Sequence, residues 1–144
     1  MMENITCNAY LFFNGNCREA MNFYRNIFGG ELQIQTFGEA DNSCLEAMKD
    51  NVMHCRLYGG DILLMASDNP GSEPLGTGKV HLALGGSDEE KLREIFDGLS
   101  AGGKVGQPLE KQMWGDIYGD LRDKYDVQWM VNITAAKSHK SGIL

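Results

Sequence analysis

Length, composition and charge predict one globular domain and exclude several classes of partner. The chain has 144 residues, of which 42% are hydrophobic and 23% charged, which suffices for a substantial core. Its net charge of -7 repels phosphate backbones and anionic lipid, and no basic stripe reverses this locally. We therefore expect no nucleic acid and no membrane as partners.

The sequence predicts a cytoplasmic protein. It has no run of about 18 apolar residues that could span a bilayer. Its first four residues lack the basic start and apolar stretch of a signal peptide. The cysteines, at positions 7, 17, 44 and 55, form no C-x-x-C pair and are typical of free thiols in a reducing compartment.

The first quarter of the chain predicts a strand followed by a helix. Residues 8–13 are rich in aromatic side chains, as expected of a buried strand. From residue 17 to residue 28 apolar side chains recur at helical spacing, with Asn16 as the expected N-cap. Gly29 and Gly30 end this helix, because glycine adopts the left-handed closing conformation at little cost.

Three strands and a linker are predicted next. Residues 31–37 alternate apolar and polar side chains, and residues 52–58 and 61–66 flank a Gly-Gly hairpin signal. The polar segment 38–51 has no assigned element and is the candidate for a flexible lid. Residues 67–78 contain two prolines and three glycines, a composition that indicates a linker.

The same order of elements then begins again. A strand over 80–84 is followed by a break at Gly85-Gly86 and by a capping box at 87–90 that opens a second helix. Gly102-Gly103 closes this helix, 73 positions after the first Gly-Gly stop. Three more strands are predicted over 105–113, 117–122 and 127–133.

This repeat predicts an α+β fold of two βαβββ modules. Module one covers about 5–67, the linker 67–78 and module two about 79–134, which together form one domain over 1–136, followed by a flexible tail over 137–144. A Rossmann sheet is disfavoured because two helices are too few and no G-x-G-x-x-G follows a strand.

Two segments resemble the PhnB-like branch of the glyoxalase/bleomycin-resistance/dioxygenase (vicinal oxygen chelate) superfamily. They are residues 10–31 (Y-L-F-F-N-G-N-C-R-E-A-M-N-F-Y-R-N-I-F-G-G-E) and 114–132 (W-G-D-I-Y-G-D-L-R-D-K-Y-D-V-Q-W-M-V-N). The hairpin at 52–68 and the strand at 79–84 fit the same pattern. The resemblance implies a pocket between two curved sheets, with the helices outside, and a homodimer.

Metal-dependent relatives are expected to bind a divalent ion through one residue on the first and last strand of each module. The usual ligands are His, Gln and Glu. The corresponding positions here are Asn8, Leu64 or Met65, His81 and Met130, with Asn132 facing the same way. One imidazole, one amide and soft thioethers hold a hard or borderline ion poorly. We therefore expect no metal and no other cofactor; if a metal binds, His81 and Asn8 would hold it.

His81 is the candidate catalytic residue, as an acid/base or a hydrogen-bonding group, with a core histidine as the alternative. Strand alternation turns Gln128 and Asn132 to the side of Met130 and turns Trp129 toward the helix. His54 is expected to be structural, and Asp116, Asp120 and Asp123 are expected to be turn residues. The predicted ligand-binding residues are Asn8, Tyr10, Leu64, His81, Trp114, Tyr118, Met130 and Asn132.

Three functions follow from the resemblance. The first is a small-molecule-binding protein without the usual metal site. The second is a lyase, isomerase or dioxygenase-type enzyme that uses a metal or His81. The third, methyl transfer to a ubiquinone precursor, is disfavoured because the chain is short and has no glycine-rich cofactor-binding strand. An interaction module without a ligand is a further alternative.

Overall fold

The computed structural model describes residues 8–40, 43–69 and 80–134. The chain forms two compact units, 1–75 and 76–144, and each is described by itself. Each unit contains one four-stranded mixed sheet and repeats the order βαβββ. The predicted α+β fold of two such modules is therefore confirmed. The predicted tail and most of the predicted linker lie outside the described residues.

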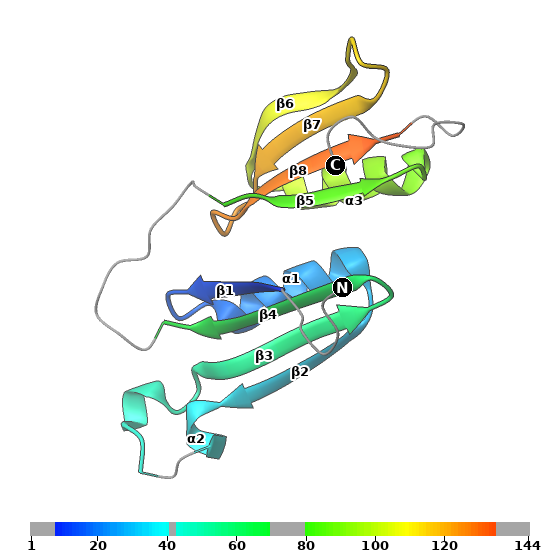
Figure 1. Ribbon diagram of the computed structural model, residues 1–144. Helices are drawn as coiled ribbons and strands as arrows, with labels where there is room; N and C mark the ends of the chain where they lie inside the picture. Colours follow the sequence, from blue (N-terminus) through cyan, green and yellow to red (C-terminus); the bar gives the residue numbers. More distant parts are fainter. Residues whose placement is uncertain (1–7, 41–42, 70–79, 135–144) are drawn as a thin grey trace. The chain divides into compact units, whose positions relative to one another are not determined.

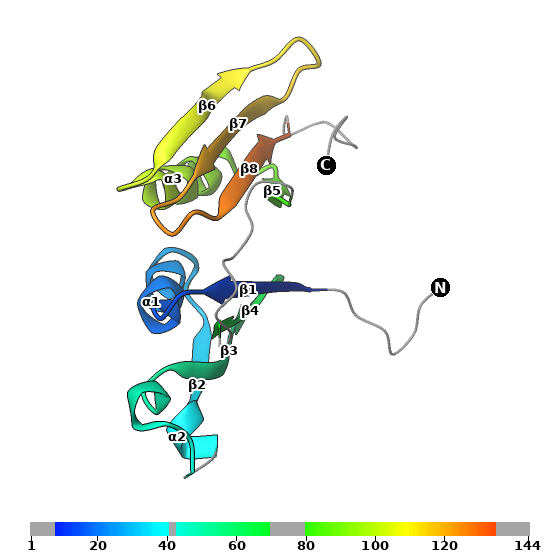
Figure 2. The ribbon, with the colours of Figure 1, turned by 90° about the vertical axis from the view of Figure 1, so that its left-hand side faces the viewer.

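The first unit consists of sheet A and helix α1. In sheet A the strand order is β1-β4-β3-β2, with β1 parallel to β4 and the other pairs antiparallel (Figure 1). Helix α1 lies on one face of the sheet (Figure 2). The elements are β1 (Ala9–Phe13), α1 (Cys17–Phe28), β2 (Glu31–Thr36), α2 (Phe37–Ala40), the 3-10 turn η1 (Glu46–Met48), β3 (Val52–Gly59) and β4 (Ile62–Asp68).

The second unit repeats this plan with sheet B and helix α3. The strand order is β5-β8-β7-β6, with β5 parallel to β8 and the other pairs antiparallel. Helix α3 lies on one face of sheet B (Figure 1). The elements are β5 (Leu82–Gly86), α3 (Glu89–Ser100), β6 (Lys104–Lys111), β7 (Ile117–Arg122) and β8 (Gln128–Ile133).

The core of the first unit lies between α1 and one face of sheet A. In the antiparallel pair of β3 and β4, Cys55 is opposite Ala66 and Leu57 is opposite Leu64, so these four buried side chains share a face. The Sγ atoms of Cys17, on α1, and Cys55 are 4.0 Å apart, which identifies that face as the one α1 covers. Alternate residues of every strand therefore point away from the helix. α1 contributes the buried residues Cys17, Ala20, Met21 and Tyr24.

The core of the second unit is built in the same way, and it depends on a glycine. A Cβ atom on Gly119 would lie 3.0 Å from Cε2 of Phe96, on α3, and 2.9 Å from the Gln107 carbonyl oxygen. Gly119 is opposite Val131, and Leu121 is opposite Trp129. These positions therefore face α3, and the predicted orientation of Trp129 toward the helix layer is confirmed.

Asp68 holds the first unit together at the end of β4. Its carboxylate accepts hydrogen bonds from two backbone N–H groups, that of Cys17 to Oδ1 at 2.9 Å and that of Val52 to Oδ2 at 2.8 Å. The predicted N-cap, Asn16, makes no side-chain cap bond, because this carboxylate, 2% exposed, satisfies the first turn of α1 instead. The predicted linker start was also wrong, since Ser67 and Asp68 belong to β4.

Three local predictions need correction. The predicted strand over 80–84 was placed to end before Gly85. Gly85 and Gly86 instead belong to β5, because β8 pairs with both. The predicted capping box began at residue 87, but the N-cap of α3 is Asp88, whose Oδ1 accepts a hydrogen bond from the Lys91 N–H at 3.1 Å. The 38–51 segment, to which the sequence assigned no element, contains most of α2 and all of η1. A hydrogen bond of 2.9 Å from the Gly38 N–H to the Lys49 carbonyl joins its two ends.

Other local predictions hold. α1 ends where the sequence indicated, with Gly29 and Gly30 at φ +77° and +95°. Cys17, Cys44 and Cys55 are free thiols, and Cys7 lies outside the described residues. Within the described ranges, no helix has the length and apolar character needed to cross a bilayer.

Replacing Asp68 by Asn should destabilise the first unit. An amide offers one acceptor where the carboxylate offers two, and it places an N–H₂ against a buried backbone donor. Hydrogen bonds to charged groups contribute roughly 1.5–3 kcal/mol each, so we expect Asp68→Asn to lower the free energy of unfolding by about 2 kcal/mol in urea denaturation. Asp61→Asn, in the exposed β3–β4 turn, is the control and should change it little. An equal effect of both substitutions would contradict this role.

Candidate functional site

The face of sheet B that points away from α3 holds most of the predicted ligand-binding residues of the second unit. We call it the open face of sheet B and define it by Ala83, Met130, Asp120, Gly85, Asn132 and Tyr118. The first three form one cross-strand row and the last three form the next. Because β5 contributes nothing larger than a methyl group to these rows, no long side chain on that strand flanks Met130 or Asn132.

Two aromatic rings accompany this face. The ring centroids of Trp114 and Tyr118 are 6.4 Å apart with an interplanar angle of 60°, the edge-to-face arrangement that aromatic pairs prefer. Trp114 remains 43% exposed. The pair therefore offers an accessible indole that is positioned by a second ring.

Tyr118 is held in its neutral form. Its hydroxyl donates to Oδ2 of Asp120 at 3.0 Å, while Oδ1 of Asp120 accepts from the Gln107 N–H at 2.9 Å. Two causes raise the pKa of Tyr118 above its ordinary value: the larger is the loss of hydration on burial, and the second is the hydrogen bond to Asp120. The phenol therefore remains an uncharged aromatic surface at neutral pH.

Asn132 and Asp116 fix the loop that carries Trp114. Nδ2 of Asn132 donates to Oδ2 of Asp116 at 3.0 Å, and both side chains are buried. The Asp116 carbonyl accepts from the Gln112 N–H at 2.8 Å, which closes the loop between β6 and β7. Asn132, predicted as a ligand-binding residue, thus lies on the expected face and is engaged in positioning this loop.

Asp123 is a turn residue, as predicted. Its Oδ1 accepts from the N–H groups of Tyr125 at 2.8 Å and Val127 at 3.1 Å, and its Oδ2 accepts from Nε1 of Trp129 at 2.8 Å. The same carboxylate therefore shapes the β7–β8 turn and satisfies the buried indole. These bonds account for its burial without a ligand.

His81 lies one residue before β5 and is exposed. Strand alternation continued by one residue gives it the same side as Ala83 and Met130. Within the residues that the structure describes, its imidazole makes no hydrogen bond or ion pair. Its role as acid/base or hydrogen-bonding group stays a prediction.

In the first unit, the structure corrects the assignment of Leu64. Leu64 is opposite Leu57 and Ala9 and is buried in the core beneath α1. Its neighbour Met65 lies on the other face, opposite Tyr10, because successive side chains of a strand alternate. Met65, which the sequence analysis gave as the alternative to Leu64, is therefore the residue of this pair that lies on the face away from α1. Asn8, just before β1, is exposed.

The face of sheet A away from α1 also holds residues that sequence reasoning passed over. We call it the open face of sheet A; it carries Tyr10, Phe12, His54, Arg56, Tyr58 and Met65. Oη of Tyr10 and Nδ1 of His54 form a hydrogen bond of 3.0 Å. His54, Arg56 and Tyr58 share this face by the two-residue period of β3, and that period was the signal available in the sequence.

Comparison with known proteins identifies the family. The model of the Glyoxalase/Bleomycin resistance protein/Dioxygenase superfamily matches residues 6–131. The chain belongs to this superfamily. Protein YjdN of Escherichia coli (strain K12) is 29% identical over 137 residues, which are 86% of this chain and 92% of that protein.

Solved structures have the same fold. Protein PA1353 of Pseudomonas aeruginosa is 35% identical, with a TM-score of 0.82 over 92% of this chain and 99% of that one. A Bacillus cereus PhnB protein, described as a putative 3-demethylubiquinone-9 3-methyltransferase, is 24% identical, with a TM-score of 0.74 over 90% and 100%. At that identity the likeness shows the fold alone, and together these relatives support the PhnB-like branch.

The donor atoms at the positions that the resemblance assigns to metal ligands do not fit a divalent ion of the usual kind. Asn8 supplies an amide, His81 an imidazole, and Met65 and Met130 thioethers. Zinc takes nitrogen, thiolate and carboxylate ligands, and thioethers select soft ions such as copper(I). Among the described residues no group of three or more His, Cys, Asp or Glu side chains is placed to hold a metal.

The Tyr118–Asp120 bond predicts a measurable titration. In Asp120→Asn the negative charge is lost, so the pKa of Tyr118 should fall toward its ordinary value while desolvation keeps part of the rise. NMR of the labelled tyrosine rings across alkaline pH would measure this. Asp126→Asn, on an exposed turn residue, should leave the Tyr118 titration unchanged; equal shifts in both variants would contradict the assignment.

Proposed function

We propose that the protein binds a small, uncharged organic molecule on the open face of sheet B, without a divalent metal. The observation that carries this proposal is the exposed Trp114 ring, set edge-to-face against Tyr118 beside the sheet face that points away from α3. Small-molecule sites combine apolar and aromatic surface with a few fixed polar groups. Here the Asn132–Asp116 bond fixes the loop that presents the indole.

Each side chain on or beside this face would make a different kind of contact with the ligand. Trp114 and Tyr118 supply aromatic surface for a flat ligand. Met130 supplies a flexible, polarisable contact between Ala83 and Asp120. His81 would supply a hydrogen bond at the margin of the face. Burial of apolar ligand surface, worth about 25 cal/mol per Å², provides the driving force.

An enzyme of the same superfamily is the second candidate. The exposed imidazole of His81 favours it, since an accessible imidazole can accept a proton from a substrate or donate one to it. A lyase, isomerase or dioxygenase-type reaction would then follow ligand binding on the same face. Methyl transfer to a ubiquinone precursor stays disfavoured, because the sequence has no glycine-rich cofactor-binding strand. We also expect a homodimer in the cytoplasm.

A neutral fluorescent dye, Nile red, tests the binding proposal directly. We expect saturable binding that quenches Trp114, with loss of this quenching in Trp114→Phe while the buried Trp129 keeps its emission. Met130→Gln removes apolar contact and should weaken binding roughly fivefold to thirtyfold, as a loss of about 1–2 kcal/mol implies. Met113→Gln is the matched control, because that side chain is 98% exposed.

Several outcomes would overturn the proposal. Quenching that does not saturate would indicate nonspecific adsorption of the dye. Equal affinities of Met130→Gln and the unmodified protein would place the dye elsewhere. Quenching that persists in Trp114→Phe would show that the dye reports on Trp129 and therefore on another part of the unit.

A further inference from the structure

The open face of sheet A differs in chemistry from the open face of sheet B. Arg56 stands in a cross-strand row with Met65 and Tyr10 on one side and Gln33 on the other. His54 lies two residues before Arg56 on β3 and so shares its face. The face therefore gathers a guanidinium, an imidazole and a phenol, all of them hydrogen-bond donors.

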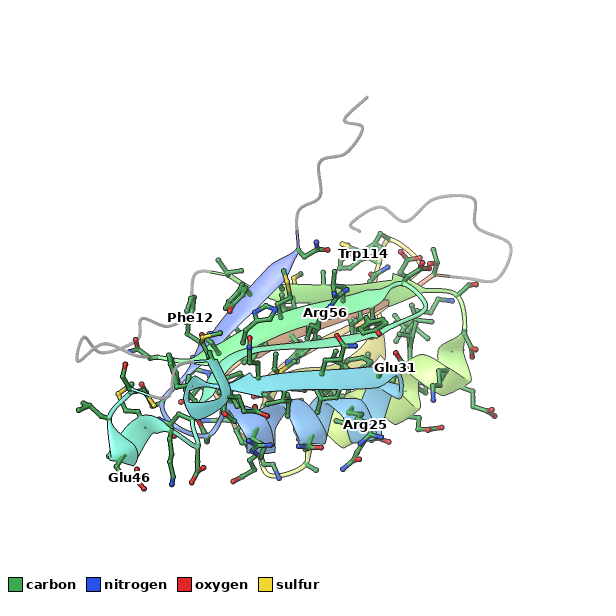
Figure 3. The ribbon with its side chains drawn as sticks, turned by 90° about the horizontal axis from the view of Figure 1, so that it is seen from below. Phe12, Arg25, Glu31, Glu46, Arg56 and Trp114 are labelled. Atoms are coloured by element: carbon green, nitrogen blue, oxygen red, sulfur yellow. The ribbon has the colours of Figure 1, made fainter. Side chains whose placement is uncertain are left out.

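Arg56 is fixed in place without a carboxylate partner. Its guanidinium carbon lies 4.7 Å from the centroid of the Tyr58 ring, an arrangement in which the ring face attracts the cation. The described ion pairs involve other cations, and Arg56 forms none of them. Figure 3 shows Arg56 on β3, on the other side of sheet A from Arg25 of α1. The planar donor fork of Arg56 therefore remains available to an acceptor.

The one carboxylate that the described strands place on this face is already engaged. Glu31, on β2, is opposite Tyr58, and its Oε2 accepts a hydrogen bond of 2.5 Å from the Tyr58 hydroxyl. The other β2 residues on the face are Gln33 and Gln35, which carry no charge. The chain as a whole has a net charge of -7, but the centre of this face carries the positive charge of Arg56.

The Tyr10–His54 pair adds a donor in any of its protonation states. When the Tyr10 hydroxyl donates to Nδ1, the imidazole proton lies on Nε2. When Nδ1 carries the proton and donates, the hydroxyl hydrogen is released for another acceptor. An imidazolium donates from both nitrogens. One N–H or O–H group therefore always remains for a ligand.

Aromatic surface adjoins these donors. Phe12 is 52% exposed and Tyr10 39% exposed, and their ring centroids are 5.2 Å apart. Phe12 comes two residues after Tyr10 on β1, so both rings lie on the open face. Exposed rings beside hydrogen-bond donors suit a ligand that has a flat apolar part and a negative end.

The donor cluster is not a by-product of the repeat. Met65 and Met130 occupy equivalent places, each opposite the second residue of its unit's first strand, Tyr10 and Ala83. The residue opposite each methionine on the next strand is Arg56 in sheet A and Asp120 in sheet B. The two units thus carry opposite charges at the same position.

We propose that the open face of sheet A binds the oxyanion of a small aromatic acid. The Arg56 fork holds two oxygens of the anion side by side, as guanidinium groups do with carboxylates and phosphates. The Tyr10–His54 pair gives a further hydrogen bond, and the ring of the acid lies against Phe12 and Tyr10. This proposal rests on residues of the first unit alone and stands if sheet B binds nothing.

Three probes that share a phenyl ring separate charge from aromatic contact: benzoate, its neutral and planar analogue benzamide, and phenyl phosphate. With the full chain, titrations followed by NMR and calorimetry should show saturable benzoate binding, with benzamide at least tenfold weaker. Resonances of His54 and Tyr10, which form the hydrogen-bonded pair, should move. The ratio of benzoate to phenyl phosphate affinity then identifies the kind of oxyanion.

Arg56→Gln should reduce the affinity for benzoate about tenfold or more and leave that for benzamide nearly unchanged. Arg56→Lys keeps the charge without the planar fork and should fall between the two. Arg25→Gln, an exposed arginine of α1, is the control that preserves binding. Circular dichroism and urea denaturation of each variant confirm folding.

The proposal is overturned if none of the three probes binds saturably. It is equally overturned if benzoate and benzamide bind alike, or if Arg56→Gln and Arg25→Gln weaken benzoate to the same extent.

Discussion

In the part of the chain that the structure describes, one long helix covers one face of each sheet, and the side chains on the other face follow from this arrangement. A four-stranded sheet needs one face buried to be stable, and α1 and α3 provide this for sheets A and B. Since strand side chains alternate, covering one face commits every second residue to the other. On sheet A these residues include Tyr10 and Phe12, whose aromatic rings are exposed. On sheet B they include Tyr118, and the exposed Trp114 ring of the β6–β7 loop lies edge-to-face against it.

The two units share a backbone plan but not a surface chemistry. Beside the equivalent methionines Met65 and Met130, sheet A has Arg56 and sheet B has Asp120. The first strands differ as well, since Tyr10 and Phe12 of β1 correspond to Ala83 and Gly85 of β5. One scaffold thus carries a donor-rich face on sheet A and a face with an acidic side chain, Asp120, on sheet B. A fold of this kind carries sites and does not dictate them.

The sequence predicted the scaffold well because its signals are local. Helical periodicity and the Gly-Gly stops placed α1 and α3, and two-residue alternation oriented Met130 and Trp129 correctly. It failed where a distant residue takes over a local task. Asp68 replaces Asn16 at the start of α1, and no pattern near Asn16 indicates this. The pairing of Tyr10 with His54 joins residues 44 positions apart, and for that reason His54 was taken as structural. Leu64 was misplaced by one residue, which in a strand moves a side chain to the opposite face.

The central claim is that this member of the superfamily holds its ligand by aromatic and hydrogen-bonding side chains instead of a metal. Its most direct test is elemental mass spectrometry of untagged protein purified without chelators. An imidazole, an amide and two thioethers predict far less than one divalent ion per chain. About one zinc, nickel, manganese or iron ion per chain, lost in His81→Ala, would contradict the account and identify a metal-dependent enzyme.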